Sequence, residues 1–385
     1  MKSVGEYADC YGCGTCSLVC SKVAIKIEEN SLGFLHPIVD KTRCVECGLC
    51  LNTCSFHQNV LSQANASCSA YAAYSNDIVV RTKCSSGGIG YELAKSAILN
   101  GYKFCGVRYN KKTHRAEHYV ADKINEIAES CGSKYLQSYT IDAFSKFQKG
   151  QQYLVVGTPC QIDSLRRYLR SKKMEQDFIL VDFFCHGVPS SLMWKRYEHE
   201  YGIENPTEVR WRDKRTGWHD SWNMVFKNKQ KETSSLMSKG DLFYKFFLRN
   251  RCLGKACYDD CKYKMISSAA DIRIGDLWGT KYQSDEVGIS GVIAFTLKGE
   301  NLLHQLKACT IIPETLAVVT ESQMKKCAVR PSSYNYVMEA LKTKMSLNEI
   351  DKKASRKEWL LDTIPAKTKY YSRRIIEKTV CSLKR

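Results

Sequence analysis

Two cysteine runs near the start of the chain have the residue type and spacing of metal ligands. Each run reads C-x2-C-x2-C-x3-C. Three closely spaced thiolates can wrap one iron–sulfur cube, while the fourth cysteine of the run reaches a second cube. The spacing therefore predicts two 4Fe–4S clusters that exchange their fourth ligands. The predicted ligands are Cys10, Cys13, Cys16 and Cys54 for one cluster, and Cys44, Cys47, Cys50 and Cys20 for the other.

A zinc site is the alternative reading of these runs, because a single run could supply four tetrahedral ligands. Two complete runs with matching spacing favour iron–sulfur clusters. This block resembles the bacterial two-cluster ferredoxins. Ser21 and Ser55 stand where those proteins usually have proline, which makes the turn after each run less rigid and leaves the ligands intact. Ferredoxins only carry electrons, so the remaining chain is expected to use them.

Composition limits the class of protein. The chain has 385 residues, 20 of them cysteine, and no export signal that would accompany a disulfide framework. No apolar run approaches the roughly 18 residues of a membrane span, so we expect a cytoplasmic protein. The net charge of +18 predicts anionic partners, with a solvated lysine-rich surface as the alternative. No nucleic-acid-binding motif is present, and we expect no nucleic-acid partner.

Beyond a polar linker at 58–68, strand-like and helix-like segments alternate, which predicts an α/β layer with a mixed sheet. Together with the first block, this gives an α+β protein. The expected strands are SAYAAYS, YKFCGVRY, QYLVVG, FILVDFF, DIRIGD and GVIAFTL, and the expected helices are 89–99, 163–170 and 300–308.

Several further motifs follow in a fixed order. They are Cys84-SSGG-Ile89, CGSKYLQS at 131–138, VGTPCQI at 156–162, FFCHGVPSS at 183–191, RWRDKRTGW at 210–218, and CYDDCKYK with ADIRIGDLWG at 257–279. Read together, they resemble the beta-subunit family of deazaflavin (coenzyme F-420) hydrogenases and dehydrogenases, which includes the plant 7-hydroxymethyl chlorophyll reductases. The resemblance divides the chain into a ferredoxin-type domain (1–60), an N-terminal beta-subunit region (69–150), a C-terminal beta-subunit region (151–340) and a basic tail (341–385).

The resemblance implies a third 4Fe–4S cluster. Its ligands would be Cys160 of TPCQ, Cys185 of FFCHG, Cys257 and Cys261. Cys160 and Cys185 also end strands expected to be neighbours, where α/β sheets bind ligands. The last pair has one residue more than the family spacing C-x2-C, so Cys252 is an alternative ligand. Buried free thiols are the competing interpretation.

The same resemblance implies FAD. The flavin-binding residues would be Ser85, Ser86, Gly87, Gly88, Gly132, Ser133, Lys134, Tyr135, Thr158 and Asp276. Glycines before a helix let backbone N–H groups approach a phosphate, although SSGG is also an ordinary helix start. Lys134 could offset phosphate charge or stabilise a reduced flavin, or could be an exposed lysine. Asp276 could bind a hydroxyl or cap a turn.

His186, next to Cys185, is the candidate catalytic proton donor, with a bond to cluster sulfur or a structural role as alternatives. We expect an iron–sulfur flavoprotein oxidoreductase that exchanges electrons with a ferredoxin or a partner redox subunit and hydride with a small molecule. It could also form an oligomer. Alternatives are a non-catalytic electron-transfer subunit and an accessory protein of surface-polysaccharide synthesis. The basic tail could contact a membrane or pack on its own domain.

Overall fold

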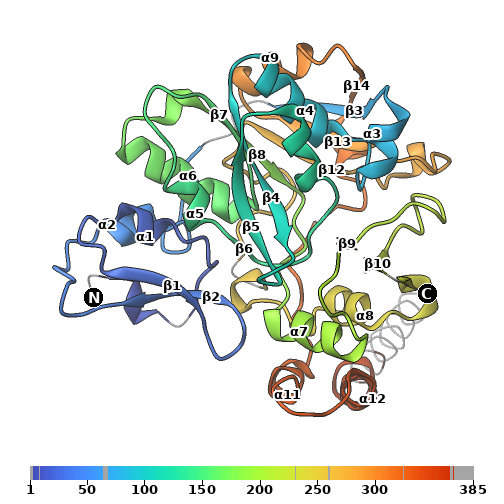
Figure 1. The fold of residues 1–385 in the computed structure, drawn as a ribbon. Helices are drawn as coiled ribbons and strands as arrows, with labels where there is room; N and C mark the ends of the chain where they lie inside the picture. The colour runs from blue at the N-terminus through green and yellow to red at the C-terminus, as the bar shows by residue number, and fades with distance from the viewer. Residues whose placement is uncertain are drawn as a thin grey trace, which may run out of the picture.

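Parallel strands form the centre of the fold and end at one common edge. The computed structural model describes residues 3–7, 9–63, 68–229, 231–258, 261–323, 325–364 and 367. Within these residues, one mixed sheet contains nine strands (Figure 1). In order across the sheet they are β14 (Cys309–Glu314), β3 (Ser69–Ser75), β13 (Ser290–Ala294), β12 (Ile272–Asp276), β8 (Phe178–Phe183), β7 (Tyr153–Val156), β4 (Lys103–Asn110), β5 (Arg115–Ala121) and β6 (Ser138–Tyr139). Neighbours among β12, β8, β7 and β4 are parallel.

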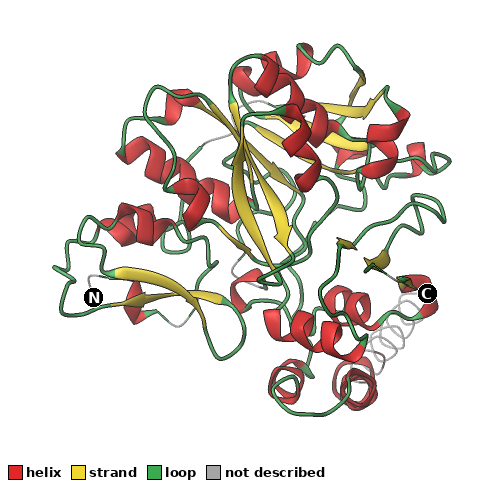
Figure 2. Ribbon diagram, viewed as in Figure 1, coloured by secondary structure: helices red, strands yellow, loops and turns green. Residues whose placement is uncertain are grey.

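Helices cover both faces of this sheet (Figure 2). On one face, α4 (Ile89–Leu99) and α9 (Leu297–His304) pack against the strands through Leu93 and Leu303. On the other face, α6 (Pro159–Ser171) and α5 (Ile141–Phe144) pack through Leu165 and Phe144. Because both faces are covered, the central strands are apolar along most of their length. The mixed α/β layer expected from the sequence is therefore present, and regions 69–150 and 151–340 contribute strands to the same sheet.

The expected helices appear with shifted ends where caps decide the boundary. The helix over 89–99 has the expected bounds, whereas the one expected at 163–170 begins at Pro159, after a capping box formed by Thr158 and Gln161. Shorter helical segments join the strands. They are α3 (Ile78–Lys83), η2 (Ile124–Ser130), η3 (Glu175–Asp177), η4 (Met237–Lys239), η5 (Lys255–Cys257), η6 (Thr280–Tyr282) and α10 (Leu316–Val319).

The cysteine-rich block has two similar halves. Each half places a short helix inside its cysteine run, α1 (Thr15–Val19) and α2 (Leu49–Thr53), and each helix follows a left-handed glycine, Gly14 or Gly48. The halves are joined by an antiparallel hairpin of β1 (Ile25–Glu29) and β2 (Leu35–Val39), and η1 (Val4–Glu6) precedes them. The duplication read from the sequence is therefore present in the backbone.

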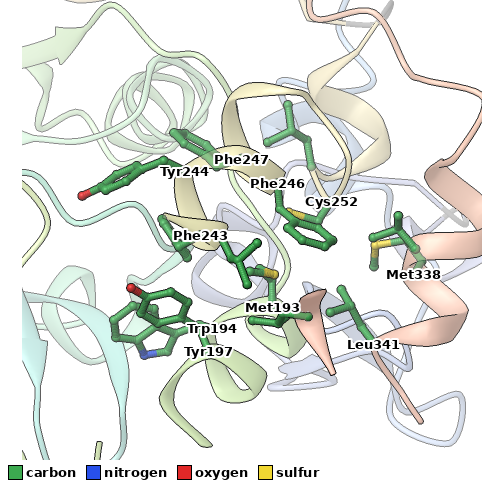
Figure 3. Packing of buried hydrophobic residues seen from close by; sticks show 14 of the residues in the cluster. Met193, Trp194, Tyr197, Phe243, Tyr244, Phe246, Phe247, Cys252, Met338 and Leu341 are labelled. Carbon is green, nitrogen blue, oxygen red and sulfur yellow. The ribbon is translucent and has the colours of Figure 1, made fainter. Parts of the chain in front are cut away.

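A second core lies below the sheet in the view of Figure 1, and Figure 3 shows its packed side chains. It joins α7 (Ser191–Glu200), α8 (Leu242–Leu248), α11 (Tyr334–Ala340) and α12 (Leu347–Glu358), beside a small sheet of β9 (Glu208–Arg210), β10 (Asn223–Lys227) and β11 (Glu232–Leu236). Trp194, Phe243 and Phe247 are among its buried members.

The first part of the basic tail packs on this second core. In α12, Leu347, Ile350 and Ala354 are buried, and Asp351 accepts from the buried Arg251. The π-helical turn η7 (Trp359–Thr363) follows and leaves its apolar side chains exposed. The other tail residues considered for membrane contact, from Tyr370 onward, lie outside the described residues. Among the described helices, none is long and apolar enough to cross a membrane.

One buried ion pair joins two central strands. Asp182 of β8 and Arg273 of β12 are opposite each other in register, both side chains have 0% exposure, and two N–H···O contacts of 2.7 Å connect them. Arg273 also donates to the carbonyls of Met265 and Ser267, so it fixes the loop that precedes β12. A bidentate guanidinium–carboxylate pair in this position satisfies both charges.

We expect Asp182→Asn to lower the free energy of unfolding by about 3–5 kcal/mol, because it leaves the Arg273 charge buried and unpaired. Urea unfolding followed by circular dichroism measures this. Lys195→Met is the control, since its contact with Glu29 is exposed (55% and 39%) and should be worth less than about 1 kcal/mol. Equal losses in the two variants would contradict the role given to the buried pair.

Candidate functional site

A cavity of about 330 Å³ lies at the carboxyl edge of the parallel strands. β7 and β8 are parallel neighbours, so Thr158, which follows β7, and Cys185, which follows β8, both face this edge. The expectation that Cys160 and Cys185 follow neighbouring strands is confirmed, with Cys160 in the first turn of α6 after β7. Asp276, the last residue of β12, reaches the same cavity. Ligand sites of α/β sheets commonly lie at such an edge.

The cavity gathers residues from both beta-subunit regions. Nine of the ten residues proposed for flavin binding line it, together with His186 and Cys185. The nine are Ser85, Ser86, Gly88, Gly132, Ser133, Lys134, Tyr135, Thr158 and Asp276. Aromatic side chains complete the wall, among them Trp222, which stacks on Tyr135 at an interplanar angle of 14°.

Gly87 does not line the cavity. A Cβ at this position would lie 2.5 Å from the carbonyl oxygen of Ala73 and 2.7 Å from the amide of Ser290. The glycine is therefore required for the approach of this loop to β3 and β13. The cofactor-binding role proposed for Gly87 from the sequence is replaced by this packing role, because its missing side chain faces the sheet.

The N-terminus of α4 faces the cavity without a side-chain cap. Gly88 precedes the helix in the left-handed region (φ 87°), and within the described part of the chain no side chain accepts from the amides of Ile89 and Gly90. Gly88, Ile89 and Gly90 all line the cavity. Free amides at a helix N-terminus attract anionic groups such as phosphate. This turn therefore fits the diphosphate of a dinucleotide.

Two loops from different parts of the chain are bound together at the cavity wall. The Ser133 amide donates to Ser85 Oγ at 2.8 Å, and the two serine hydroxyls are 2.9 Å apart. The loop at 84–88 is held further by Lys214, whose ammonium donates to the carbonyls of Arg81, Ser86 and Val287. The wall is therefore pre-formed.

Lys134 is engaged with the backbone. Its ammonium donates to the carbonyls of Glu129 (2.9 Å), Cys131 (2.9 Å) and Gly132 (3.1 Å). Burial lowers the pKa of Lys134 to about 8. All three N–H groups have partners, so Lys134 is neither an exposed lysine nor a free phosphate ligand. Its charge can still act on the cavity at longer range.

Arg212 is a site residue that the sequence reasoning missed. Its side chain has 0% exposure and pairs with Asp276 Oδ2 at 3.0 Å, while its guanidinium lies 4.7 Å from the centre of the Trp222 ring. The other oxygen, Asp276 Oδ1, is buried and has no hydrogen-bond partner among the described residues. An unpaired buried acceptor in the wall fits a ligand hydroxyl or N–H. The arginine-rich motif RWRDKRTGW was the available signal.

His186 lies in the cavity wall as a buried imidazole. Its Nε2 is 3.3 Å from the Phe247 carbonyl, and burial lowers its pKa. Burial therefore favours the neutral ring, with Nε2–H donating to this carbonyl. To give a proton to a substrate, His186 would first have to leave this contact.

The four cysteines proposed for the third cluster lie together. Burial first, and then the negative charge that Cys185, Cys257 and Cys13 would carry, raise the pKa of the Cys160 thiol. Cys257 has Cys185 and Cys261 as charged neighbours in the same way. Without a metal, these thiols raise each other's pKa and stay protonated. A metal centre binds thiolates, so its binding is expected to release their protons. The set brings together residues from three distant parts of the chain.

The alternative ligand Cys252 lies elsewhere. It is fully buried in the second core beside Phe246 (Figure 3), and burial raises its pKa to about 12. Cys327, which the sequence reasoning did not consider, is closer to the cluster position, with its Sγ 3.3 Å from the Cys261 carbonyl. The structure therefore favours Cys261 over Cys252 as the fourth ligand beside Cys160, Cys185 and Cys257. Cys327 is a neighbour of this ligand set.

In the N-terminal block, Cys54 lies with the first run. The thiols of Cys10 and Cys16 each have Cys13 and Cys54 as charged neighbours. Fewer contacts join the cysteines proposed for the second cluster. A thiolate at Cys47 would raise the pKa of Cys50, and Cys20 packs in the small core that contains Cys50. The structure thus brings together the exchanged set that the spacing predicts for the first cluster.

Within the described residues, no three His, Cys, Asp or Glu side chains lie tightly enough to hold a single metal ion. A cubane cluster takes one thiolate at each of four irons, so its ligands are spread further apart.

Two lysines missed by the sequence reasoning lie beside the cysteines. Lys262 lowers the pKa of Cys54, and Lys264 lowers that of Cys185, each against the larger effect of burial.

Comparison with known proteins supports the resemblance over part of the chain. Residues 150–316 match the family described as the C terminus of the coenzyme F420 hydrogenase/dehydrogenase beta subunit. The F420-reducing NiFe hydrogenase complex from Methanosarcina barkeri contains a chain with 16% identity and a TM-score of 0.48, over 75% of this chain and 90% of that chain. No curated protein matches the sequence. The family match confirms the resemblance that the motifs between Gly157 and Gly279 indicated.

We expect Lys134→Met to accelerate amide hydrogen exchange across residues 129–134 by about tenfold, because three carbonyls lose a charged donor. Hydrogen exchange with mass spectrometry measures this. Lys123→Met, an exposed position at the other end of η2, is the control and should leave the exchange unchanged. Unchanged exchange in Lys134→Met would show that the ammonium does not hold this turn.

Proposed function

We propose that the chain is an iron–sulfur flavoprotein oxidoreductase. It would pass electrons between the clusters of residues 1–60, a third 4Fe–4S cluster and FAD, for hydride exchange with a small molecule or a second cofactor. The family matched by residues 150–316 consists of hydrogenase and dehydrogenase beta subunits, which supports a redox role. One observation carries the more detailed proposal: a continuous series of cysteines leads from the N-terminal block to the cavity.

The series begins in the first cysteine run. Cys160 and Cys261 pack in one cluster with Tyr11, which stands between Cys10 and Cys13 in the sequence, and Cys185 lies in the cavity wall. Thiolates at Cys13 and Cys185 would both raise the pKa of Cys160, so these cysteines are near one another. Packing between the two parts of the chain keeps Cys13 in place, since its carbonyl accepts from Thr140 Oγ1 at 2.8 Å. A cluster on Cys10, Cys13, Cys16 and Cys54 would thus lie next to the one on Cys160, Cys185, Cys257 and Cys261.

The cavity fits a flavin by its donors and its shape. The uncapped amides of α4 suit the diphosphate, and the unpartnered Asp276 Oδ1 suits a hydroxyl or ring N–H. The aromatic walls suit a flat ring system, and 330 Å³ is within the range of small-ligand pockets. A bound flavin would supply the conversion between one-electron and hydride chemistry.

The chain's own residues prepare this site. Trp222, Tyr135 and Phe247 exclude water from the wall, which strengthens electrostatic interactions inside it. Arg212 orients the Asp276 carboxylate, and Ser85 and Ser133 fix the distance between the two wall loops. His186 remains the candidate for moving a proton at Nε2, after release of the Phe247 carbonyl.

A simple electron carrier has no need for this cavity. Cys185 joins the predicted third cluster directly to a lined cavity, which favours catalysis over the alternative of a non-catalytic subunit. We place the activity in the cytoplasm, with a ferredoxin or a partner redox subunit as the electron-exchange partner. The sequence charge of +18 suits an acidic partner of this kind. Either direction of electron flow is consistent with the site.

The metal content tests the cluster assignment. Anaerobically purified protein is expected to contain about twelve iron and twelve acid-labile sulfide per chain, four of each for every cluster. Cys261→Ser should lower both to about eight, whereas Cys327→Ser should leave them at about twelve. Inductively coupled plasma and sulfide assays measure these values. If Cys327→Ser lowered the iron and sulfide content and Cys261→Ser did not, Cys327 would be the cluster ligand instead of Cys261. About eight iron and eight sulfide per wild-type chain would contradict a third cluster.

A side chain added at Gly90 tests the flavin site. Gly90 lies in the first turn of α4, where a Cβ would meet only Ile274 Cδ1 at 3.2 Å, so Gly90→Leu extends into the cavity region at little cost to the helix. We expect at least about a tenfold loss of bound FAD, measured by flavin release and fluorescence, with iron–sulfur absorbance retained. Ser96→Leu, on the same helix and outside the cavity lining, is the control. Full flavin content in Gly90→Leu would place the cofactor elsewhere.

A further inference from the structure

Two cysteines outside the predicted cluster ligands face each other in the cavity wall. Cys84 ends α3 and Cys131 ends η2, and both line the cavity. The two thiols are close enough to change each other's pKa, and Cys131 Sγ also lies 3.9 Å from the Ile127 carbonyl oxygen. The residues are distant in sequence, so only the fold brings them together.

The neighbouring contacts hold the pair in position. Ser85 and Ser133, which are one and two residues along the chain from the cysteines, form the bridge between the two loops. The backbone amide of each cysteine donates within its own helical turn, to the carbonyls of Val80 and Ala128. Both sulfur atoms are thus presented by fixed backbone at the cavity wall.

We propose that Cys84 and Cys131 are a redox-active dithiol that forms a reversible disulfide by exchange with a small-molecule disulfide in the cavity. This function goes beyond electron transfer through clusters and flavin, and the exchange needs neither of them. The pair combines the requirements of such a couple, which are two adjacent thiols, access for a small disulfide, and a stabilised thiolate on one of them.

The charges around the pair identify the attacking sulfur. The contact with the Cys84 thiol, followed by the nearby charges of Lys134 and Lys83, lowers the pKa of Cys131 to about 7 against the effect of burial. The same contact and burial raise the pKa of Cys84, against the charges of Lys214 and Lys134. Tyr91 lies near both thiols. Cys131 is therefore the nucleophile and Cys84 the resolving thiol.

The exchange balances in two steps. The Cys131 thiolate attacks one sulfur of the small disulfide, forms a mixed disulfide and releases one thiolate. Cys84 then loses its proton and attacks Cys131 Sγ, which forms the protein disulfide and releases the second thiolate. Two electrons pass from the cysteines to the small disulfide. The proton lost by Cys84, and the one that Cys131 released to solvent on ionising, are available to protonate the two thiolates released.

Peptide mapping of the full-length protein tests the proposal directly. Anaerobically purified protein is treated with glutathione disulfide or with dithiothreitol, quenched with iodoacetamide and digested with trypsin. Cleavage after lysine releases residues 84–95 and 124–134, each with a single cysteine. We expect the two peptides to be linked after glutathione disulfide, with both free thiols reduced by at least about tenfold, and separately alkylated after dithiothreitol.

Variants assign the roles of the two sulfurs. In Cys84→Ser, the resolving step is lost, and a glutathione adduct should accumulate on peptide 124–134. In Cys131→Ser, peptide 84–95 should remain without an adduct. Cys309→Ser, which removes a half-buried cysteine of β14, should leave the linked peptide unchanged. Free, alkylated Cys84 and Cys131 in the wild type after glutathione disulfide would overturn the proposal, and an adduct only on Cys84 would overturn the assignment of the nucleophile.

Discussion

The buried ion pair between Asp182 and Arg273 connects the sheet to the candidate site. It joins the two strands whose ends carry Cys185 and Asp276, and Ser268 donates a further hydrogen bond to Asp182. Arg273 also holds the carbonyls of the 263–267 loop, and from this loop Lys264 donates to the Cys185 carbonyl at 2.9 Å. Charges this deep need complete pairing. The position of the proposed third cluster therefore depends on the same contacts that satisfy this pair.

The N-terminal block is fixed on the rest of the chain by polar contacts with backbone groups. Gln137 donates to the Tyr11 carbonyl at 3.0 Å and accepts from the Leu35 amide at 2.7 Å. One side chain therefore contacts both the first cysteine run and β2. Lys262 donates to the carbonyls of Ser55, Phe56 and Gln58. Because Gln137 and Lys262 bind backbone groups, these hydrogen bonds do not depend on the side chains of the N-terminal block. The proposed electron transfer would require a fixed spacing between neighbouring clusters, and these contacts would maintain it.

The cavity combines apolar walls with a few fully engaged charges. Lys134, Lys214 and Arg212 each have partners within the protein, which allows these cations to be buried near one another. The neutral amides of α4 and the free oxygen of Asp276 are left for a ligand. Selectivity would thus come from the backbone and one carboxylate, while the cations set the local potential. Of these cations, Lys134 also lowers the pKa of Cys131, so the proposed dithiol and the proposed flavin site share this charge.

The sequence alone determined the features that depend on local spacing. The two similar halves of the cysteine-rich block, the central strands and the bounds of α4 follow from repeats of a few residues, which periodicity and motif spacing record. The parallel order of β7 and β8 decided that Cys160 and Cys185 meet, as the sequence reasoning expected. Other features required the tertiary structure. The Arg212–Asp276 pair joins residues 64 apart, and Gly87 is needed by strands that pack against it. Likewise, Cys84 and Cys131 become a pair only where two helical turns meet, because a contact between distant residues leaves no periodic signal in the chain.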